Sequence, residues 1–279
     1  MRTALYSFLT SLALVAGPAA AQAPRPLTTG RIVRHSAVLD QLLAPSAQLE
    51  VISSGHGHVE GPMWVPDSSM LLFSDTPSRT IYRWRAADAK RSKFLEYSGY
   101  TGRMPYSKEP GSNGLALDGR GNLLLCEHGD RRLASLPIGQ QSGKRTVVDA
   151  YQGKRFNSPN GRTLYVSNAD SLRPLILAYE VGKNGKLSKP RPFFDMTSLP
   201  RTRFKEVPDG LKVDLAGNVY AAGFGGLLII SAQGQLLGTI DPGEPVSNCA
   251  WGDDGHSLYV MASSLVLRVK TLAQGVPGR

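Results

Sequence analysis

Five acid or amide residues recur along the chain, each at the start of a similar segment. The segments begin at Glu60, Asn113, Asn160, Asp209 and Asn248. Each intact copy continues with an apolar stretch, a turn of Asp, Gly or Asn, and a second apolar stretch, which is the pattern of a β-hairpin. If the copies surround one axis, the five side chains converge there, and converging oxygen atoms suit a hard cation.

Three of these residues are the candidate metal ligands. Glu60, Asn160 and Asp209 supply two carboxylates and an amide oxygen, which with water can hold Ca²⁺, Mg²⁺, Mn²⁺ or Zn²⁺. We expect one divalent ion, with calcium favoured and zinc, magnesium or manganese as alternatives. Acids and amides at strand starts also cap turns, so turn capping is the alternative role for any one of them.

The intervals between the five positions indicate the elements that must hold them. They are about 40–50 residues, with several short β-rich runs in each, which is the spacing of propeller blades. We predict an all-β fold, a β-propeller in one domain over 49–279. The third copy is damaged, because Gly161 follows Asn160 directly and no inner strand lies between the leading residue and its turn. About one blade is therefore expected to be missing or incomplete near residue 160.

The N-terminus has the pattern of a secretory signal peptide over 1–21. Arg2 is followed by an apolar stretch over 5–16 and by Ala19–Ala21, a small-residue cleavage signal. We expect a periplasmic or secreted protein with no membrane span after cleavage. Residues 22–48 are predicted as an extended lead-in with one short helical turn.

Charge and cysteine usage exclude some functions. The net charge is +10, from 32 basic and 22 acidic residues. The basic residues are scattered and no aromatic platform motif is present, so nucleic acid is not an expected partner; a soluble basic surface is expected, with attraction of anionic sugars or envelope polymers as the alternative. We expect a monomer. Cys126 and Cys249 occupy different repeat offsets and are predicted to be buried free thiols.

Further polar residues could contact a substrate or a metal. Arg103 lies in a Gly/Pro-rich loop before Asn113, where a substrate-binding lid or a passive loop would fit. His128 follows an apolar strand and could orient a substrate or simply belong to a turn. His56 and His58 alternate with Glu60, so they could bind zinc or belong to an approach loop.

Several motifs together resemble one known family. They are EGPMW at 60–64, SNGLALD at 112–118, CEHGDRR at 126–132, KRFNSPN at 154–160, GRTLYVSNAD at 161–170, VPDGLKVDLAGNVYAAG at 207–223 and SNCAWG at 247–252. Over essentially the whole mature chain, the sequence resembles the gluconolactonase/regucalcin-like (senescence marker protein) family. The resemblance implies a six-bladed β-propeller with a divalent metal at its axis that hydrolyses sugar lactones and related esters. It places the ligand Glu on Glu60 and the ligand Asp, which is also the proposed catalytic base, on Asp209.

The departure from the family pattern falls at Asn160. The family has one asparagine that contacts substrate and, a blade later, a second that binds metal. Here the first motif is fused to the segment after the second, so Asn160 can replace only one of them, as metal ligand or substrate contact. Asn113, Asn160, Arg103 and His128 are the predicted substrate-binding residues.

Three functional hypotheses follow from this sequence. The first is an exported metal-dependent lactonase acting on sugar lactones or related esters, with Asp209 as base. The second is a non-catalytic propeller that acts as a binding or scaffold protein of the cell envelope, inactive because of the internal deletion. The third is a remnant that does not fold.

Overall fold

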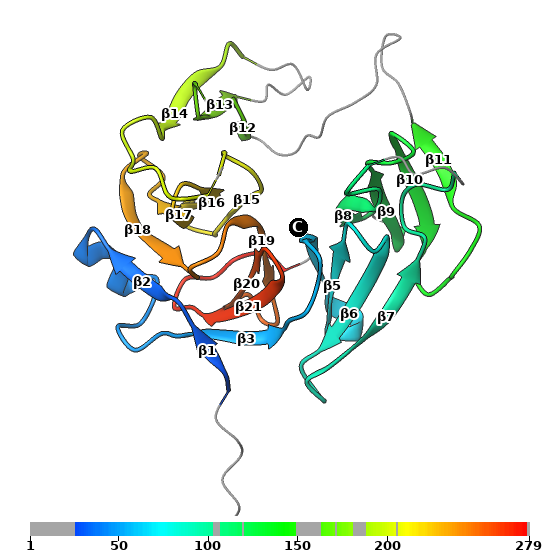
Figure 1. Cartoon of the computed structure of the whole chain (residues 1–279). Helices are drawn as coiled ribbons and strands as arrows, with labels where there is room; N and C mark the ends of the chain where they lie inside the picture. Colours follow the sequence, from blue (N-terminus) through cyan, green and yellow to red (C-terminus); the bar gives the residue numbers. More distant parts are fainter. Residues whose placement is uncertain are drawn as a thin grey trace, which may run out of the picture.

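The computed structural model describes residues 26–102, 107–118, 120–148, 163–170, 172–180, 188–204 and 206–277. In these ranges, 21 strands form five antiparallel sheets around a common centre (Figure 1). This arrangement is a β-propeller with five blades, as the repeat predicts. No helix in the described ranges is long and apolar enough to cross a membrane.

Two blades have the regular four-stranded order. Their strands follow one another along the chain, so each blade is a meander of three hairpins. The first blade consists of β4 (Val59–Val65), β5 (Met70–Asp75), β6 (Thr80–Arg85) and β7 (Lys90–Glu96). The second blade consists of β8 (Ser112–Leu117), β9 (Asn122–Glu127), β10 (Arg132–Pro137) and β11 (Arg145–Val148).

Two other blades are completed by strands from the N-terminal part of the chain. The predicted lead-in thus contains strands and a 3₁₀ helix, η1 (Ala37–Gln41), and it contributes to the propeller. One blade consists of β15 (Leu211–Val213), β16 (Val219–Gly223), β17 (Gly226–Ile230), β18 (Leu236–Asp241) and β2 (Arg31–Arg34). The other consists of β19 (Val246–Gly252), β20 (Ser257–Ala262), β21 (Leu265–Lys270), β3 (Leu49–Ser53) and β1 (Thr28–Thr29). A second short 3₁₀ helix, η2 (Pro66–Ser68), forms the turn between β4 and β5.

The fifth blade is incomplete. It has three strands, β12 (Thr163–Asn168), β13 (Leu175–Glu180) and β14 (Arg191–Asp195). By its sequence, β12 corresponds to the second strand of the other blades, so the inner strand is the one that this sheet lacks in the described residues. This confirms the incomplete blade predicted near residue 160. Asn160 itself lies outside the described residues.

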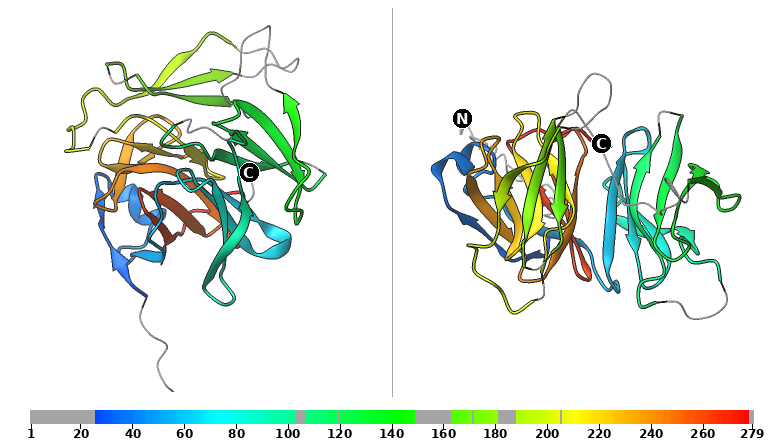
Figure 2. Two further views of the ribbon diagram at one scale, coloured as in Figure 1. Left: turned by 45° about the vertical axis from the view of Figure 1, so that its right-hand side comes forward. Right: turned by 90° about the horizontal axis from the view of Figure 1, so that it is seen from above.

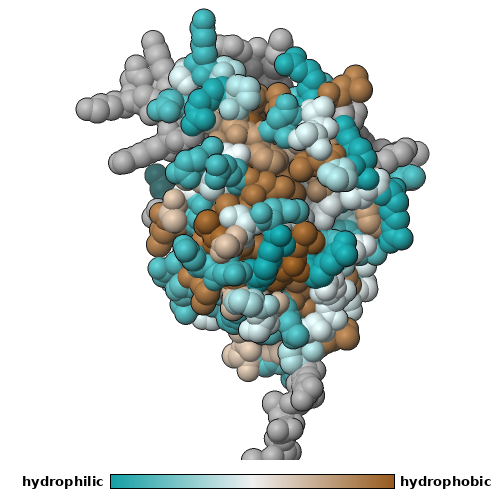
Figure 3. All heavy atoms as spheres, turned by 90° about the vertical axis from the view of Figure 1, so that its left-hand side faces the viewer, coloured by the Kyte–Doolittle hydropathy of each residue, from teal (hydrophilic) through white to brown (hydrophobic). Residues whose placement is uncertain are grey.

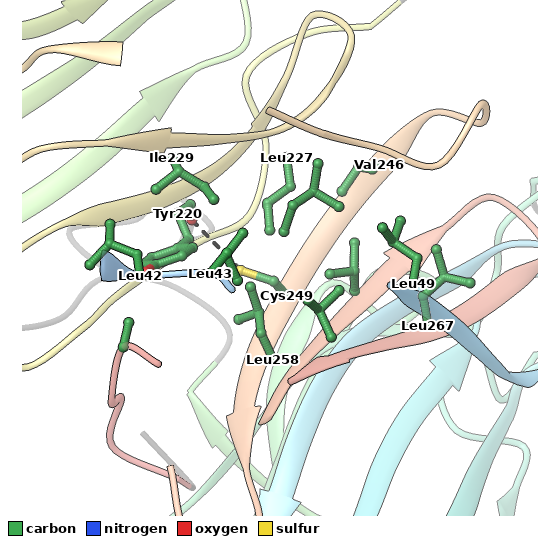
Figure 4. Close-up of a cluster of buried hydrophobic side chains, with 14 of the residues drawn as sticks. Leu42, Leu43, Leu49, Tyr220, Leu227, Ile229, Val246, Cys249, Leu258 and Leu267 are labelled. Atoms are coloured by element: carbon green, nitrogen blue, oxygen red, sulfur yellow. Dashed lines mark hydrogen bonds between the residues drawn. The ribbon is translucent and has the colours of Figure 1, made fainter. Parts of the chain in front are cut away.

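Four clusters of buried apolar side chains join the five sheets in a row. One cluster joins β8–β11 to β4–β7, the next joins β4–β7 to β19–β21, the third joins β19–β21 to β15–β18, and the fourth joins β15–β18 to β12–β14. Figure 4 shows the third, where Tyr220 and Leu227 face Cys249 and Leu258. No such cluster among the described residues joins β12–β14 to β8–β11, which are the two ends of this row. Figure 2 shows the same row of blades from two further directions.

Two hairpin turns are built by the same side-chain pattern. Asp118 Oδ1 accepts a hydrogen bond from the Asn122 backbone N–H at 2.8 Å, and Asp214 Oδ1 accepts one from Asn218 at 2.8 Å. In both turns the asparagine side chain also donates to Oδ2 of the aspartate. The intervening glycine has positive φ in both turns, which side chains disfavour. The repeated Asp–Gly–Asn signal in the sequence therefore predicts these hairpins for a physical reason.

Two further features of the structure are its mixed polar and apolar surface and its two free cysteines. On the face in Figure 3, hydrophobic side chains lie between hydrophilic ones, as expected because apolar atoms contribute much of the surface of any folded protein. Both cysteines are free thiols, and Cys249 is buried as predicted. The prediction of a buried Cys126 was wrong, because Cys126 is exposed. By strand alternation it points away from Leu125, which packs in the cluster with β4–β7.

Candidate metal and active site

Glu60 is held at the start of an inner strand, with 2 % of its surface exposed. Its Oε2 accepts hydrogen bonds from the Gly61 N–H at 2.9 Å and from Asn248 Nδ2 at 3.2 Å. Burial raises the pKa of Glu60, and the hydrogen bonds from Gly61 and Asn248 offset part of that effect. Desolvation disfavours an isolated buried carboxylate, so this residue would be stabilised by a nearby positive charge.

Asp209 lies in the loop before β15. Its backbone N–H donates to Ala222 O at 3.2 Å, and its carbonyl oxygen accepts a hydrogen bond from Ser167 Oγ at 2.6 Å. The side chain reaches solvent. Desolvation by the surrounding protein nevertheless raises the pKa of Asp209 to about 7, and the negative charges of Glu60 and Glu109 add to this effect.

Two glycines allow the leading residues of neighbouring blades to come together. A Cβ on Gly61 would lie 2.0 Å from the Asn113 carbonyl oxygen, and a Cβ on Gly210 would lie 2.1 Å from Asn248 Cγ. Real Cβ atoms do not come this close to other heavy atoms, so a side chain at Gly61 would have to displace backbone, and one at Gly210 would have to displace the Asn248 amide. Glu60 and Asp209 are therefore each followed by a glycine, and a residue of the adjacent blade packs where a side chain would otherwise lie. The resulting order around the centre is Asn113, Glu60, Asn248 and Asp209.

Serine hydroxyls join successive blades beside this group. Ser74 Oγ donates to Asn113 O at 3.0 Å, Ser167 Oγ donates to Asp209 O, and Ser247 Oγ donates to Val59 O at 2.9 Å. Sequence reasoning missed these contacts. A signal was present, because Ser74 in MLLFSD and Ser167 in TLYVSN occupy one offset in the second strand of their blades.

The structure describes two of the four predicted substrate-binding residues, Asn113 and His128. Asn113 is half-buried on β8, next to the glycine that follows Glu60. His128 is exposed, and its Nδ1 lies 3.0 Å from the carbonyl oxygen of Glu109. Glu109, which sequence reasoning did not single out, is close enough for its charge to raise the pKa of Asp209. Arg103 and Asn160 lie outside the described residues.

A zinc site with His56 finds no support in the geometry. His56 is buried between Phe73 and Tyr82, with ring centroids 5.1 Å from each, and its Nε2 lies 2.8 Å from Ser53 Oγ. Burial lowers the pKa of His56 to about 4, and the nearby Arg91 charge contributes. This imidazole therefore serves the packing of the first blade.

The donor set fits a hard divalent cation. In the part of the chain that the structure describes, no three or more histidine, cysteine or acidic side chains group as a metal cluster. The central group instead combines the carboxylates of Glu60 and Asp209 with Asn113, while Asn248 donates its Nδ2 hydrogen bond to Glu60. Oxygen donors of this kind suit calcium better than softer metals. Both acids have raised pKa values, so a cation between them would favour their ionised forms.

The fold and the central oxygen-lined site define the class as a β-propeller with a candidate cation site at its axis. Residues 152–264 match the family model described as SMP-30/Gluconolactonase/LRE-like region. A protein of Zymomonas mobilis named gluconolactonase is 32 % identical over 319 aligned residues, covering 89 % of this chain and 88 % of that protein. The chain belongs to the SMP-30/gluconolactonase/LRE-like family.

One further relative and two solved structures are also similar to this chain. A protein of Haloferax volcanii named pentonolactonase XacC is 24 % identical over 235 residues, covering 72 % of this chain and 80 % of that protein. A gluconolactonase structure from Xanthomonas campestris has a TM-score of 0.73 at 22 % identity, covering 89 % of this chain and 98 % of the other. A calcium-binding regucalcin structure from Agrobacterium tumefaciens has a TM-score of 0.61 at 14 % identity, covering 82 % and 95 %. At these identities the two structures establish the fold.

The related proteins also differ from this chain in the number of blades. The neighbouring propellers have six blades, whereas this chain has five in the described residues. The alignment with the Zymomonas mobilis protein spans 319 positions, more than the 279 residues of this chain. The relative therefore has residues without a counterpart here, as expected if a segment is missing.

Proposed function

We propose that this protein is a lactonase that hydrolyses sugar lactones or related esters with the help of one divalent cation. The observation that carries the proposal is the convergence of Glu60 and Asp209, two carboxylates with raised pKa values, beside Asn113 and Asn248 at the centre of the propeller. The relatives named gluconolactonase and pentonolactonase support the reaction class and the sugar-lactone substrate. The N-terminal signal supports export to the periplasm or medium.

Glu60 and Asp209 are the proposed metal ligands, with Asn160 as the predicted third. Calcium is favoured because the donors are oxygen atoms and because a related fold is described as calcium-binding. A cation bound there would polarise the lactone carbonyl and stabilise the negative charge that develops on its oxygen.

Asp209 is the proposed general base. Its carboxylate accepts a proton from a water molecule as the water oxygen attacks the lactone carbonyl carbon. When the ring C–O bond breaks, the protonated Asp209 returns that proton to the departing alkoxide, which yields the open hydroxy acid. Exposure of the side chain to solvent suits this role, because both water and substrate can reach it. Asn113, His128 and Arg103 are proposed to bind the hydroxyl groups of the sugar.

A second function is favoured by the incomplete blade. Within the described residues, the β12–β14 sheet has no inner strand and no apolar cluster joins it to β8–β11. A propeller of this kind could serve as a non-catalytic binding protein of the cell envelope.

Hydrolysis of glucono-1,5-lactone by the purified mature chain separates the two functions. The lactonase proposal expects activity that a chelator removes and calcium restores, and a large loss of activity in Asp209→Asn and Glu60→Gln. Asp67→Asn is the matched control, because it neutralises an exposed carboxylate on η2, away from the centre. Equal activity of the wild type and Asp209→Asn would refute the role of Asp209. A folded wild type with no lactonase activity would favour the binding protein.

A further inference from the structure

Asn248 has both ends of its side-chain amide engaged. Its Oδ1 accepts a hydrogen bond from the Cys249 N–H at 2.9 Å, and its Nδ2 donates to Glu60 Oε2 at 3.2 Å. Rotating the amide by half a turn would place its oxygen against the carboxylate and its NH₂ group against an N–H donor. The two contacts therefore fix which end of the amide faces Glu60.

The backbone around Asn248 is also held on both sides. Ser247 O accepts a hydrogen bond from Gly210 N–H at 2.9 Å, and Ser247 Oγ donates to Val59 O at 2.9 Å. The absence of a Cβ on Gly210 leaves the space that the Asn248 side chain occupies. Asn248 thus lies between the loop of Asp209 and the strand of Glu60, with little freedom to move.

We propose that Asn248 is a positioning residue that orients the Glu60 carboxylate toward the cation and is not itself a ligand. The end of its side-chain amide that faces Glu60 is the NH₂ group, which cannot bind a cation, while its oxygen is turned to the Cys249 N–H. Its NH₂ group acts on the metal site through Glu60. The inference rests on the proposed cation site and adds a residue that the predicted ligand set did not include.

The expected effect is on metal affinity. Partners that orient a metal ligand typically change affinity by about 10–100-fold when they are removed. Asn248→Ala is therefore expected to weaken calcium binding by about 10–100-fold, while the number of water molecules on the bound ion stays the same. If Asn248 were a direct ligand, its removal would add a water molecule to the ion.

The test combines calorimetric titration of the chelator-treated mature protein with calcium and terbium luminescence lifetimes in H₂O and D₂O, which count the coordinated waters. Glu60→Gln, which alters a proposed ligand, is the comparison. Melting curves in chelator establish that each variant is folded. Asn248→Thr, which suits a strand, is the second variant if Asn248→Ala does not fold, and its affinity and water count are interpreted in the same way.

Weaker calcium binding with an unchanged water count supports the proposal. Unchanged affinity, or one additional water, overturns it. A wild type that binds no calcium overturns this proposal together with the cation site. A wild type that binds calcium but hydrolyses no lactone overturns the proposed enzyme, while the affinity of the variants still decides the role of Asn248.

Discussion

Three glycines that follow leading residues of the repeat offer a matched test of how the site is assembled. Gly61, Gly114 and Gly210 occupy the same offset in their blades. A Cβ on Gly61 or Gly210 would collide with the adjacent blade at 2.0 and 2.1 Å, whereas the nearest atom to a Cβ on Gly114 is Cys126 Sγ at 3.6 Å. Gly61 also has φ of +51°, a conformation that side chains disfavour.

The alanine variants should therefore differ in stability. Overpacking costs about 1–3 kcal/mol, so Gly210→Ala is expected to destabilise by that amount. Gly61→Ala adds about 1–2 kcal/mol for its left-handed backbone. Gly114→Ala is expected to be neutral or to stabilise by about 0.4–1 kcal/mol, because alanine restricts the unfolded chain.

Melting temperatures in chelator measure these differences directly. For a chain of this size, 1 kcal/mol corresponds to about 2–4 °C. Gly61→Ala should melt lowest, then Gly210→Ala, with Gly114→Ala at or above the wild type. Equal melting temperatures for the three variants would show that the close approach of the blades does not exist, and the site built from it would be refuted.

Three further predictions concern titration, the serine contacts and the thiols. In chelator, the raised pKa values of Glu60 and Asp209 contribute stability that is present at low pH and is lost as pH rises toward the folded-state pKa of about 7 for Asp209. Asp209→Asn should therefore reduce the decline in melting temperature between about pH 4 and pH 8. An identical pH profile in the variant and the wild type would contradict the assignment. Ser167→Ala removes the hydrogen bond to Asp209 O and should cost about 0.5–1.5 kcal/mol, measured by denaturant unfolding, with an unchanged midpoint as the contrary result. A thiol reagent should modify Cys126 in the native protein and Cys249 only after unfolding, and rapid reaction of both in mass spectra would be inconsistent with the packing around Cys249.

Much of the site could be predicted from the sequence, because a propeller places equivalent positions of each repeat at one axis. Glu60, Asp209, Asn113 and Asn248 do come together. The contact between Asn248 and Glu60 could not be predicted, because it joins residues on different blades that are distant in the sequence. The raised pKa of Asp209 likewise depends on desolvation by the surrounding protein and on the charges of Glu60 and Glu109, which only the tertiary structure brings near it.

The sequence by itself determined the repeat, the all-β fold and the position of the damage, since hairpin patterning and the lost inner strand are local features. It also determined the family through motifs that cover most of the chain. Only the tertiary structure decided which glycines are obligatory, which serines join the blades, and that His56 is part of a packed core. Those properties depend on distances between strands of different blades, and local patterns do not encode such distances.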